Sequence, residues 1–277
     1  MKISVIFTTY NSPEWLQKVL WGFQYQTDTN FEVVVADDGS TDETRKVIDR
    51  TRDETGMVIQ HVWHEDNGFQ KCRILNKALL AAKGEYVVMT DGDCIPRSDF
   101  IAVHRANAQP GFFLSGGYFK LPMDISKAIT RDDIAQGTCF RKSWLIDRGM
   151  KSSIKFMKLN AGVVRAAIYN KLTFTKPTWN GHNASCYLSD AFRVNGFDER
   201  MRYGGQDREF GERLTNLGLK AKQIRYSAIC VHLDHARGYE NKADWETNRN
   251  IRETTVREHI IETPFGIKQI NELPTQP

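Results

Sequence analysis

Two acidic clusters, far apart in the sequence, carry the side chains best suited to chemistry. The first is the TDGD segment at residues 90–93, which follows an apolar run at residues 86–89. The second is the GGQD segment at residues 204–207, at the start of a helix-like stretch. Paired carboxylates at the end of a buried strand suit a hard divalent cation, which often shares its oxygen ligands with substrate phosphates. A separate carboxylate across a cleft can accept a proton. Together these clusters indicate metal-assisted transfer from a phosphate-activated donor.

Alternating strand and helix patterns precede and surround the first cluster. Apolar runs predict strands at residues 3–8, 31–36, 57–62 and 86–90, and capped periodic segments predict helices at residues 13–23, 41–52 and 70–83. This order predicts a mostly parallel sheet with helices on both faces. Ligands of such sheets bind beyond the carboxyl ends of the strands. Thr8 to Asn11, Asp37 with Asp38, and residues 91–93 therefore converge on one rim.

The second half of the chain is less regular. Strands are predicted at residues 112–119 and 224–232, and a short helix at residues 209–217. The last strand leads into the HLDH segment at residues 232–235, and a polar helix is predicted around Trp245. No repeat, low-complexity segment or interdomain linker interrupts this pattern, so we expect one domain.

Composition excludes several classes of protein. The chain has 40% hydrophobic and 26% charged residues and a formal net charge of +4, which is too weak a positive charge to indicate nucleic-acid binding. The sequence has no apolar run of the roughly 18 residues that a membrane span needs, and the run at residues 3–7 is too short for a signal peptide. Five cysteines without a CxxC spacing fit reduced thiols in a cytoplasmic protein.

Five segments resemble one family of enzymes. VIFTTYN at residues 5–11, VADDGSTD at residues 35–42 and TDGD at residues 90–93 resemble family 2 glycosyltransferases of the GT-A fold. GFDE at residues 196–199 and GGQDREF at residues 204–210 resemble the acceptor-side motif of β-1,4-galactosyltransferases and chondroitin polymerases. The resemblance implies a single Rossmann-like GT-A domain. Its nucleotide-sugar-binding half would span residues 1–110, its acceptor-binding and catalytic half residues 111–240, and a helical tail residues 241–277.

The same resemblance assigns donor-binding residues. Matched position by position, it implies that the uracil and ribose of a UDP-sugar are held by Thr8, Tyr10 and Asp38. Asp66 would also approach the base, and Arg73 and Asn76 are candidates for the ribose-phosphate side. Read from the residues alone, Tyr10 could instead be a packing aromatic, and Asp38 part of a turn that leads into a helix cap.

A metal site follows from the same comparison. Asp91 and Asp93 resemble the DxD pair of these enzymes, with Asp93 as the direct ligand of Mn²⁺ or Mg²⁺. A histidine after the last strand completes the site in related enzymes, and the sequence offers both His232 and His235 without choosing between them. The competing interpretation is that Asp91-Gly92-Asp93 is a solvated turn and that His232 is structural.

Asp207 matches the catalytic base of the resembling enzymes. From the residues alone it sits where a helix N-cap belongs, and Glu209 is the second candidate for the base. Related enzymes usually carry an acid immediately before the aspartate, whereas this chain has Gln206, which puts acceptor recognition in question more than the chemistry.

The predicted function is inverting transfer of a sugar from a UDP-sugar to a hydroxyl of a glycan or lipid-linked acceptor, in bacterial polysaccharide or lipopolysaccharide synthesis. A nucleotidyltransferase and a non-catalytic glycan-binding module are the alternatives. Residues 141–176 carry nine basic side chains against one acid, Asp147, with apolar residues between them. Such a run is usually a solvated face, but the apolar residues also suit peripheral contact with an anionic membrane at its inner face.

Overall fold

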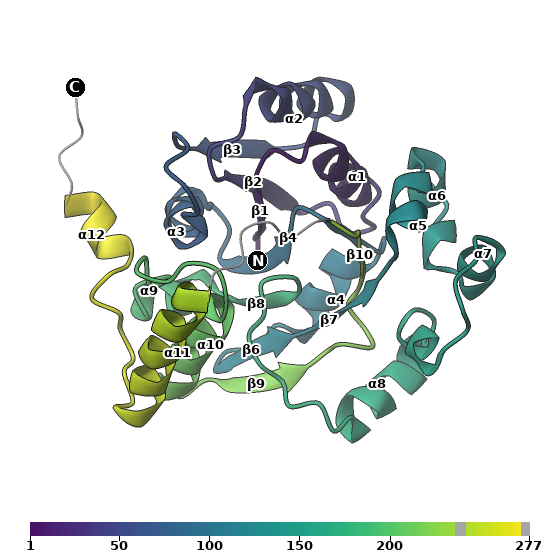
Figure 1. The fold of residues 1–277 in the computed structure, drawn as a ribbon. Coiled ribbons are helices and arrows are strands. Elements are labelled where there is room, and N and C mark those ends of the chain that lie inside the picture. The colour runs from purple at the N-terminus through teal and green to yellow at the C-terminus, as the bar shows by residue number, and fades with distance from the viewer. Residues whose placement is uncertain (236–241, 273–277) are drawn as a thin grey trace.

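A computed structural model describes residues 1–235 and 242–272 of the chain, which form an α/β structure (Figure 1). The main sheet has seven strands in the order β3-β2-β1-β4-β8-β6-β9. In chain order their bounds are β1 Ile3–Thr9, β2 Phe31–Asp37, β3 Ile59–Trp63, β4 Tyr86–Asp91, β6 Phe112–Ser115, β8 Ala184–Tyr187 and β9 Lys220–Gln223. A smaller sheet has the order β5-β10-β7 and consists of β5 Cys94–Pro96, β7 Gly117–Lys120 and β10 Ile229–His232.

The predicted mostly parallel sheet is confirmed. Strands β1, β2, β3 and β4 pair in parallel, and β8 enters the sheet antiparallel to both β4 and β6. The helices are α1 Pro13–Gln24, α2 Asp42–Thr55, α3 Lys71–Ala81, α4 Phe100–Asn107, α5 Met123–Ala128, α6 Arg131–Ala135, α7 Lys142–Asp147, α8 Gly162–Leu172, α9 Leu188–Arg193, α10 Gln206–Asn216, α11 Lys242–Arg257 and α12 Ile267–Glu272, with 3₁₀ turns η1 Thr138–Phe140 and η2 Ile154–Lys158.

Two apolar cores lie on opposite faces of the sheet, because successive strand side chains point to opposite sides. Val5 of β1 packs with Leu16 of α1 in one core, and Ile6 packs with Ile74 of α3 in the other. These helices bury the sheet from both sides and leave its carboxyl edge open. The first half of the sequence therefore builds a rigid platform for the polar residues at that edge.

The second half departs from the predicted elements at three places. The strand predicted at residues 112–119 breaks at Gly116, where a Cβ would lie 2.1 Å from the Asn183 side chain, so β6 and β7 belong to different sheets. The strand predicted at residues 224–232 is extended only over β10, because Ala228 closes a turn onto the carbonyl of Ile224. The helix predicted at residues 209–217 begins earlier, at Gln206.

Helix α11 lies along α10 (Figure 1). Asn216 at the end of α10 donates to the carbonyl oxygens of Thr255 and Ile260, at 3.1 and 2.8 Å. The described part of the predicted tail is therefore joined to α10 by its own hydrogen bonds. Within residues 1–235 and 242–272, no helix is long and apolar enough to cross a membrane.

Candidate active site

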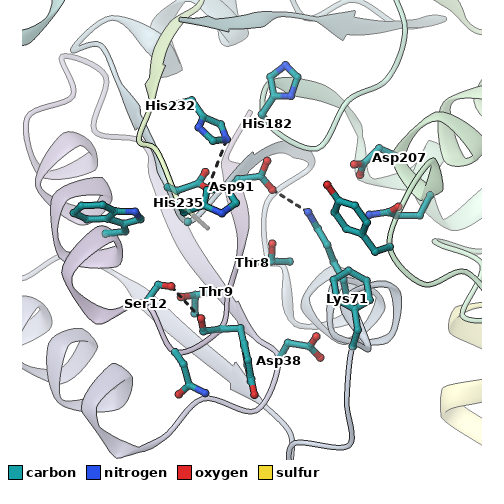
Figure 2. Close-up of a pocket in the computed structure, with 18 of the residues that line it drawn as sticks. Thr8, Thr9, Ser12, Asp38, Lys71, Asp91, His182, Asp207, His232 and His235 are labelled. Carbon is teal, nitrogen blue, oxygen red and sulfur yellow. Dashed lines mark hydrogen bonds and ion pairs between the residues drawn. The ribbon is translucent and has the colours of Figure 1, made fainter. Parts of the chain in front are cut away.

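A cavity of about 650 Å³ opens at the carboxyl ends of β1, β2 and β4 (Figure 2). Its volume lies within the range of small-molecule sites. Nine of the eleven residues proposed from the sequence line it: Thr8, Tyr10, Asp38, Asp66, Asp91, Asp93, Asp207, His232 and His235. Residues distant in sequence are thus brought into one site.

Arg73 and Asn76 do not line this cavity. Asn76 is fully buried on α3, where it donates to the carbonyl of Phe197 and accepts from the Phe197 backbone N–H at 2.7 Å. It fastens α3 to the segment before α10. We therefore keep neither Arg73 nor Asn76 in the proposed donor site.

The turn between Asp91 and Asp93 depends on a close backbone approach. Asp91 pairs in register with Thr8 of β1, and the N–H of Gly92 donates to the Thr8 carbonyl at 3.0 Å. A Cβ at residue 92 would lie 2.5 Å from that oxygen, so only glycine fits. The chain can therefore turn immediately after β4 and present both aspartates to the cavity.

The smaller sheet brings two histidines to Asp93. Strand β10 pairs antiparallel with β5 so that His232 lies opposite Cys94. His235 Nε2 is 3.1 Å and His232 Nε2 is 3.6 Å from Asp93 Oδ2. The indole N–H of Trp15 donates to the Asp234 carbonyl, which fixes the segment that carries both histidines.

These side chains fit a divalent cation. The Nδ1 atom of His232 is buried and has no hydrogen-bond partner. One carboxylate with imidazole nitrogens suits Mn²⁺ better than Mg²⁺, which prefers oxygen ligands. Cys94 is also close to Asp93 and His232, and its thiolate would be a further ligand for such a cation.

Lys71 is a site residue that the sequence did not reveal. Its Nζ lies 2.9 Å from Asp91 Oδ1 (Figure 2). Burial alone would lower the pKa of Lys71, but the surrounding carboxylates, Asp91 foremost, outweigh it and raise the pKa. Among the described residues that line this cavity, Lys71 is the sole lysine or arginine. It therefore supplies the fixed positive charge of an otherwise acidic site.

Two carboxylates, Asp66 and Asp38, accept the hydrogen bonds that hold the Tyr10 end of the cavity. Tyr10 donates its hydroxyl to Asp66 at 2.8 Å, and the N–H of Gly68 donates to the same carboxylate at 3.0 Å. Asp38 bonds to His64 at 2.8 Å and accepts from the N–H of Gln70 at 3.0 Å. The half-exposed Tyr10 ring therefore lies beside the carboxylates of Asp66 and Asp38. An aromatic ring beside hydrogen-bond acceptors suits a planar ligand, such as a nucleobase, that carries N–H groups.

Asp207 faces the cavity from its opposite wall (Figure 2). Gly205, with a φ of 88°, is the N-cap of α10, so Asp207 lies within the first turn and is not the cap. Burial raises the pKa of Asp207, and Asp91 raises it further, while Lys71 opposes them. Its Oδ1 is buried without a hydrogen-bond partner. A carboxylate held in this way can accept a proton from a bound hydroxyl.

Helix α11 holds the loop that leads to Asp207. The side-chain amide of Asn248 donates to the carbonyl oxygens of residues 202, 203 and 204, the last at 2.7 Å. The Trp245 ring packs on Gly204, where a Cβ would come within 2.8 Å of it. Gln206 accepts from the N–H of Gly204 at 2.9 Å, so its amide also stabilises the loop.

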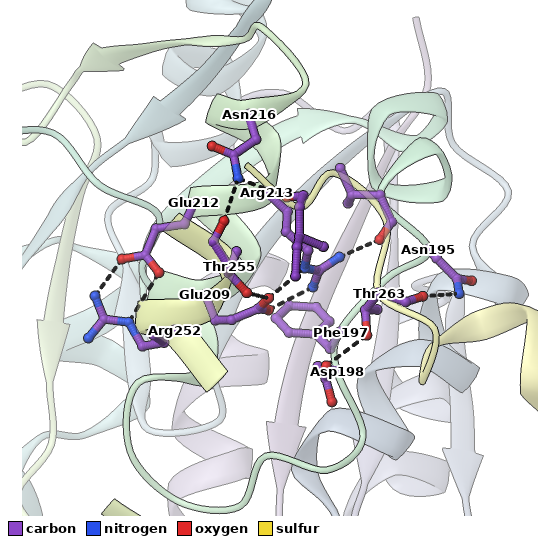
Figure 3. A network of polar contacts seen from close by, with 12 residues as sticks. Asn195, Phe197, Asp198, Glu209, Glu212, Arg213, Asn216, Arg252, Thr255 and Thr263 are labelled. Atoms are coloured by element: carbon purple, nitrogen blue, oxygen red, sulfur yellow. Dashed lines mark hydrogen bonds and ion pairs between the residues drawn. The ribbon is translucent and has the colours of Figure 1, made fainter. Parts of the chain in front are cut away.

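Glu209 has a different environment from Asp207 (Figure 3). It is buried and forms a two-point ion pair with Arg213, at 2.8 and 2.9 Å, and accepts from the Thr255 hydroxyl at 3.0 Å. Arg213 also donates to the Val194 carbonyl. Glu209 lines neither this cavity nor its neighbour, so we do not keep it as a candidate base.

Tyr118 and His182 also line the cavity and were not proposed from the sequence. Their rings meet edge to face, with centroids 4.5 Å apart. Burial lowers the pKa of His182 to about 4, so its imidazole is neutral near pH 7. Neither residue stands in a motif. Tyr118 reaches the site through the pairing of β7 with β10, and His182 through the turn that precedes β8, and the local sequence shows neither arrangement.

Comparison with known proteins points to one family. Residues 4–112, less than half of the chain, match the family model of glycosyl transferase family 2. Over this region the chain is similar to that family. Its relatives include the chondroitin synthase of Escherichia coli, 28% identical over 90% of this chain but covering only 37% of that protein. The chain spans 16 to 69% of the length of the first curated relatives.

Solved structures show the same fold. A structure of residues 1–349 of TarS from S. aureus, in complex with UDP-GlcNAc, matches 97% of the chain and 69% of its own length, with a TM-score of 0.62 and 18% identity. A mannosyltransferase from Pyrobaculum calidifontis, in complex with GDP-Man and Mn²⁺, matches 100% of the chain and 66% of its own length, with a TM-score of 0.58 and 22% identity. The chain therefore has the GT-A fold.

Proposed function

We propose that the chain is an inverting, metal-dependent glycosyltransferase that moves a sugar from a UDP-sugar to a hydroxyl of a glycan or lipid-linked acceptor. The observation that carries this proposal is the shared cavity. His232 and His235 stand on one wall and Asp207 on the opposite wall, with Lys71 between them (Figure 2). Asp93 also lines the cavity and lies beside both histidines. A diphosphate and an acceptor hydroxyl can therefore meet at one sugar.

The donor is proposed to lie along the sheet edge. Tyr10, Asp38 and Asp66 would contact the nucleoside, and the diphosphate would lie between Lys71 and Asp93. Asp93 with His232 and His235 would hold Mn²⁺ or Mg²⁺. When bound there, such a cation neutralises negative charge on the departing diphosphate. The relatives support a nucleotide-sugar donor, because one was solved with UDP-GlcNAc and another with GDP-Man.

Asp207 is proposed as the general base. It takes the proton of the acceptor hydroxyl while that oxygen forms a bond to the anomeric carbon. The bond between the anomeric carbon and the donor phosphate oxygen breaks, and the electron pair leaves with the nucleoside diphosphate. One displacement from the opposite face inverts the anomeric configuration. Lys71, already charged, stays beside the leaving group.

A panel of UDP-sugars, with and without chelator, tests this proposal. We expect UDP release with one donor, loss of that release in EDTA and recovery with Mn²⁺. Nuclear magnetic resonance of the product should show the inverted anomer. Release of pyrophosphate from a nucleoside triphosphate would instead indicate a nucleotidyltransferase. Glycan binding with no turnover of any donor would indicate a binding module.

We also propose that the face around α8 docks on an anionic membrane surface. Large apolar side chains are exposed along η2 and α8: Ile154, Met157, Val163, Val164, Ile168, Leu172 and Phe174. Val163 and Ile154 are 89 and 81% exposed. Lys151, Arg165 and Lys171 stand exposed among them, and no acid occurs between Asp147 and Asp190. An apolar patch within a basic rim suits a bilayer interface with anionic lipids. The patch would bring the site to a lipid-linked acceptor.

A further inference from the structure

A second cavity, of about 940 Å³, adjoins the first. Tyr118, His182 and Asp207 line both, so the proposed base stands where the two meet. The first cavity holds the donor under the proposed function. The second is then the space from which an acceptor hydroxyl reaches Asp207.

The charges of this second cavity are one-sided. Seven basic residues line it: Lys120, Lys155, Lys158, Lys176, Arg208, Arg225 and Arg252. Within residues 1–235 and 242–272, Asp207 is the only acid in its lining. Lys120 pairs with Asp234, and Arg252 with Glu212. In the part of the chain that the structure describes, the other five basic residues have no acidic partner within 4.0 Å.

Three of these basic residues, Lys155, Lys158 and Arg225, repel one another electrostatically. Burial lowers the pKa of Lys158, and the positive charges of Arg225 and Lys155 lower it further. The Nε atom of Arg225 is buried without a hydrogen-bond partner. Like charges held together without a counter-charge are unfavourable. A bound anion would relieve this repulsion and satisfy the orphaned guanidinium nitrogen.

Other unsatisfied atoms belong to the same lining. Four of the eight buried side-chain atoms without a partner among the described residues are Trp179 Nε1, Asp207 Oδ1, Gln223 Oε1 and Arg225 Nε, all on residues that line this cavity. Buried polar atoms are normally hydrogen-bonded. Donors and acceptors in one cavity suit a ligand with hydroxyl groups as well as an acidic group.

We infer that the second cavity binds an acceptor sugar that carries an acidic group, a carboxylate or a phosphate, through Lys155, Lys158 and Arg225. This inference rests on the proposed function and adds the chemical class of its acceptor. The cation cluster holds the acidic group, and the reacting hydroxyl extends towards Asp207. A neutral acceptor would leave the three cations uncompensated.

Binding measurements test the inference without relying on turnover. Three sets of oligosaccharides of equal length are titrated against the protein in the presence of UDP and Mn²⁺. One set ends in a uronic acid, one carries a phosphodiester, and one is neutral. We expect one acidic set to bind roughly ten- to a hundredfold more tightly than the neutral set, as hydrogen bonds to charged groups would provide. The favoured acidic set identifies carboxylate or phosphate.

The matched variants are Lys158→Met with Arg225→Met, and, as a control, Arg165→Met with Lys171→Met. Both pairs remove two positive charges, but the control residues line neither cavity. The first pair should lose the preference for acidic sugars and keep its affinity for UDP, and the control should keep both. Lys158→Arg with Arg225→Lys should retain the preference, which guards against a folding defect.

Equal affinity for all three sets, or binding of none, would overturn the inference. So would an equal loss in the control pair, which would indicate general electrostatic attraction. A weakened affinity for UDP in the first pair would place these cations at the donor instead. Failure of the proposed function has a separate signature, because it would appear as absent UDP binding or absent turnover in the unaltered protein.

Discussion

The two cavities differ in charge and in the kind of structure that builds them. Among the described residues, five carboxylates and one lysine line the first, whereas seven basic residues and one carboxylate line the second. Parallel strand ends build the first, with Asp91 and Thr8 in fixed register. Turns and short helices build much of the second. Under the proposed function, the regular half would hold the nucleotide and the metal, and the irregular half the acceptor.

The proposed base, Asp207, belongs to both sides of this comparison. Asp207 lines the acidic cavity and the basic one, and α11 fixes its loop through Asn248. Under the proposed function, a proton acceptor at this junction would separate donor recognition from acceptor recognition. Variants can therefore be chosen that weaken donor binding or acceptor binding and leave the other unchanged.

The largest effect is expected at the junction. Asp207→Asn should keep the fold and the affinity for UDP, because Gly205 caps α10 and the amide is nearly isosteric. Loss of a general base typically lowers the rate by about 10²- to 10⁴-fold. Steady-state kinetics and calorimetry with UDP measure the two quantities. Near-normal turnover in this variant would remove Asp207 from the mechanism.

The pH profile of the unaltered enzyme gives an independent check on Asp207. Its base form is the carboxylate, and burial raises its pKa. Turnover should therefore fall as pH decreases through that raised pKa, at a pH above the ordinary aspartate value of about 3.9. The fall should be seen in kcat, while UDP affinity measured at the same pH values changes less.

On the donor side, the largest loss of affinity is expected from a change at Asp93. Asp93→Ala should remove Mn²⁺-dependent UDP binding, because the carboxylate lies beside both histidines. Changes around metal sites commonly cost about 10- to 100-fold in affinity, and loss of a direct ligand should reach at least the upper end. Titration with Mn²⁺ should also separate His232→Ala from His235→Ala. Equal UDP affinity in chelator and in Mn²⁺ for the unaltered protein would contradict a metal role.

A smaller effect on the same side is expected from Lys71→Met. The methionine keeps most of the side-chain volume but leaves Asp91 without its 2.9 Å partner. Donor affinity should fall by roughly tenfold, the scale of one hydrogen bond to a charged group. Lys77→Met, on the same helix but outside both cavities, is the control. An unchanged KM for the donor would show that Lys71 serves only to neutralise Asp91.

The sequence predicted the lining of the first cavity better than that of the second, and the reason is the range of the interactions. Residues at the ends of β1, β2 and β4 are placed by local strand patterns, so Thr8, Asp38 and Asp91 could be predicted to meet. Asn76 looked like a ligand contact, but its partner is Phe197, a residue that only tertiary packing brings near. Lys71 resembled any exposed helix lysine, because nothing local shows that α3 begins beside Asp91.

The basic residues of the second half could not be assigned to their surfaces from the sequence. The basic run at residues 141–176 could be read as one surface. The structure divides it, since Lys155 and Lys158 line the second cavity while Arg165 and Lys171 stand beside exposed apolar residues. Residues 148–189 contain no acid, which signalled an anionic partner but not that two separate surfaces use it.

The smallest effect is expected at the α8 face, where many weak contacts would add up. Val163→Ser with Val164→Ser removes two side chains that are 89 and 73% exposed, so the fold should be unaffected. Full burial of each valine is worth about 1.5 kcal/mol or more, and partial burial at a lipid interface should give roughly a tenfold loss of vesicle binding. Sedimentation with vesicles of anionic and of neutral lipid measures the vesicle binding of this variant. Val58→Ser with Val256→Ser, exposed valines outside the α8 face, should bind as the unaltered protein does. If the unaltered protein does not bind anionic vesicles at low salt, the α8 face is not a lipid-docking surface. The inference about the basic cavity would then depend on the acceptor-binding measurements alone.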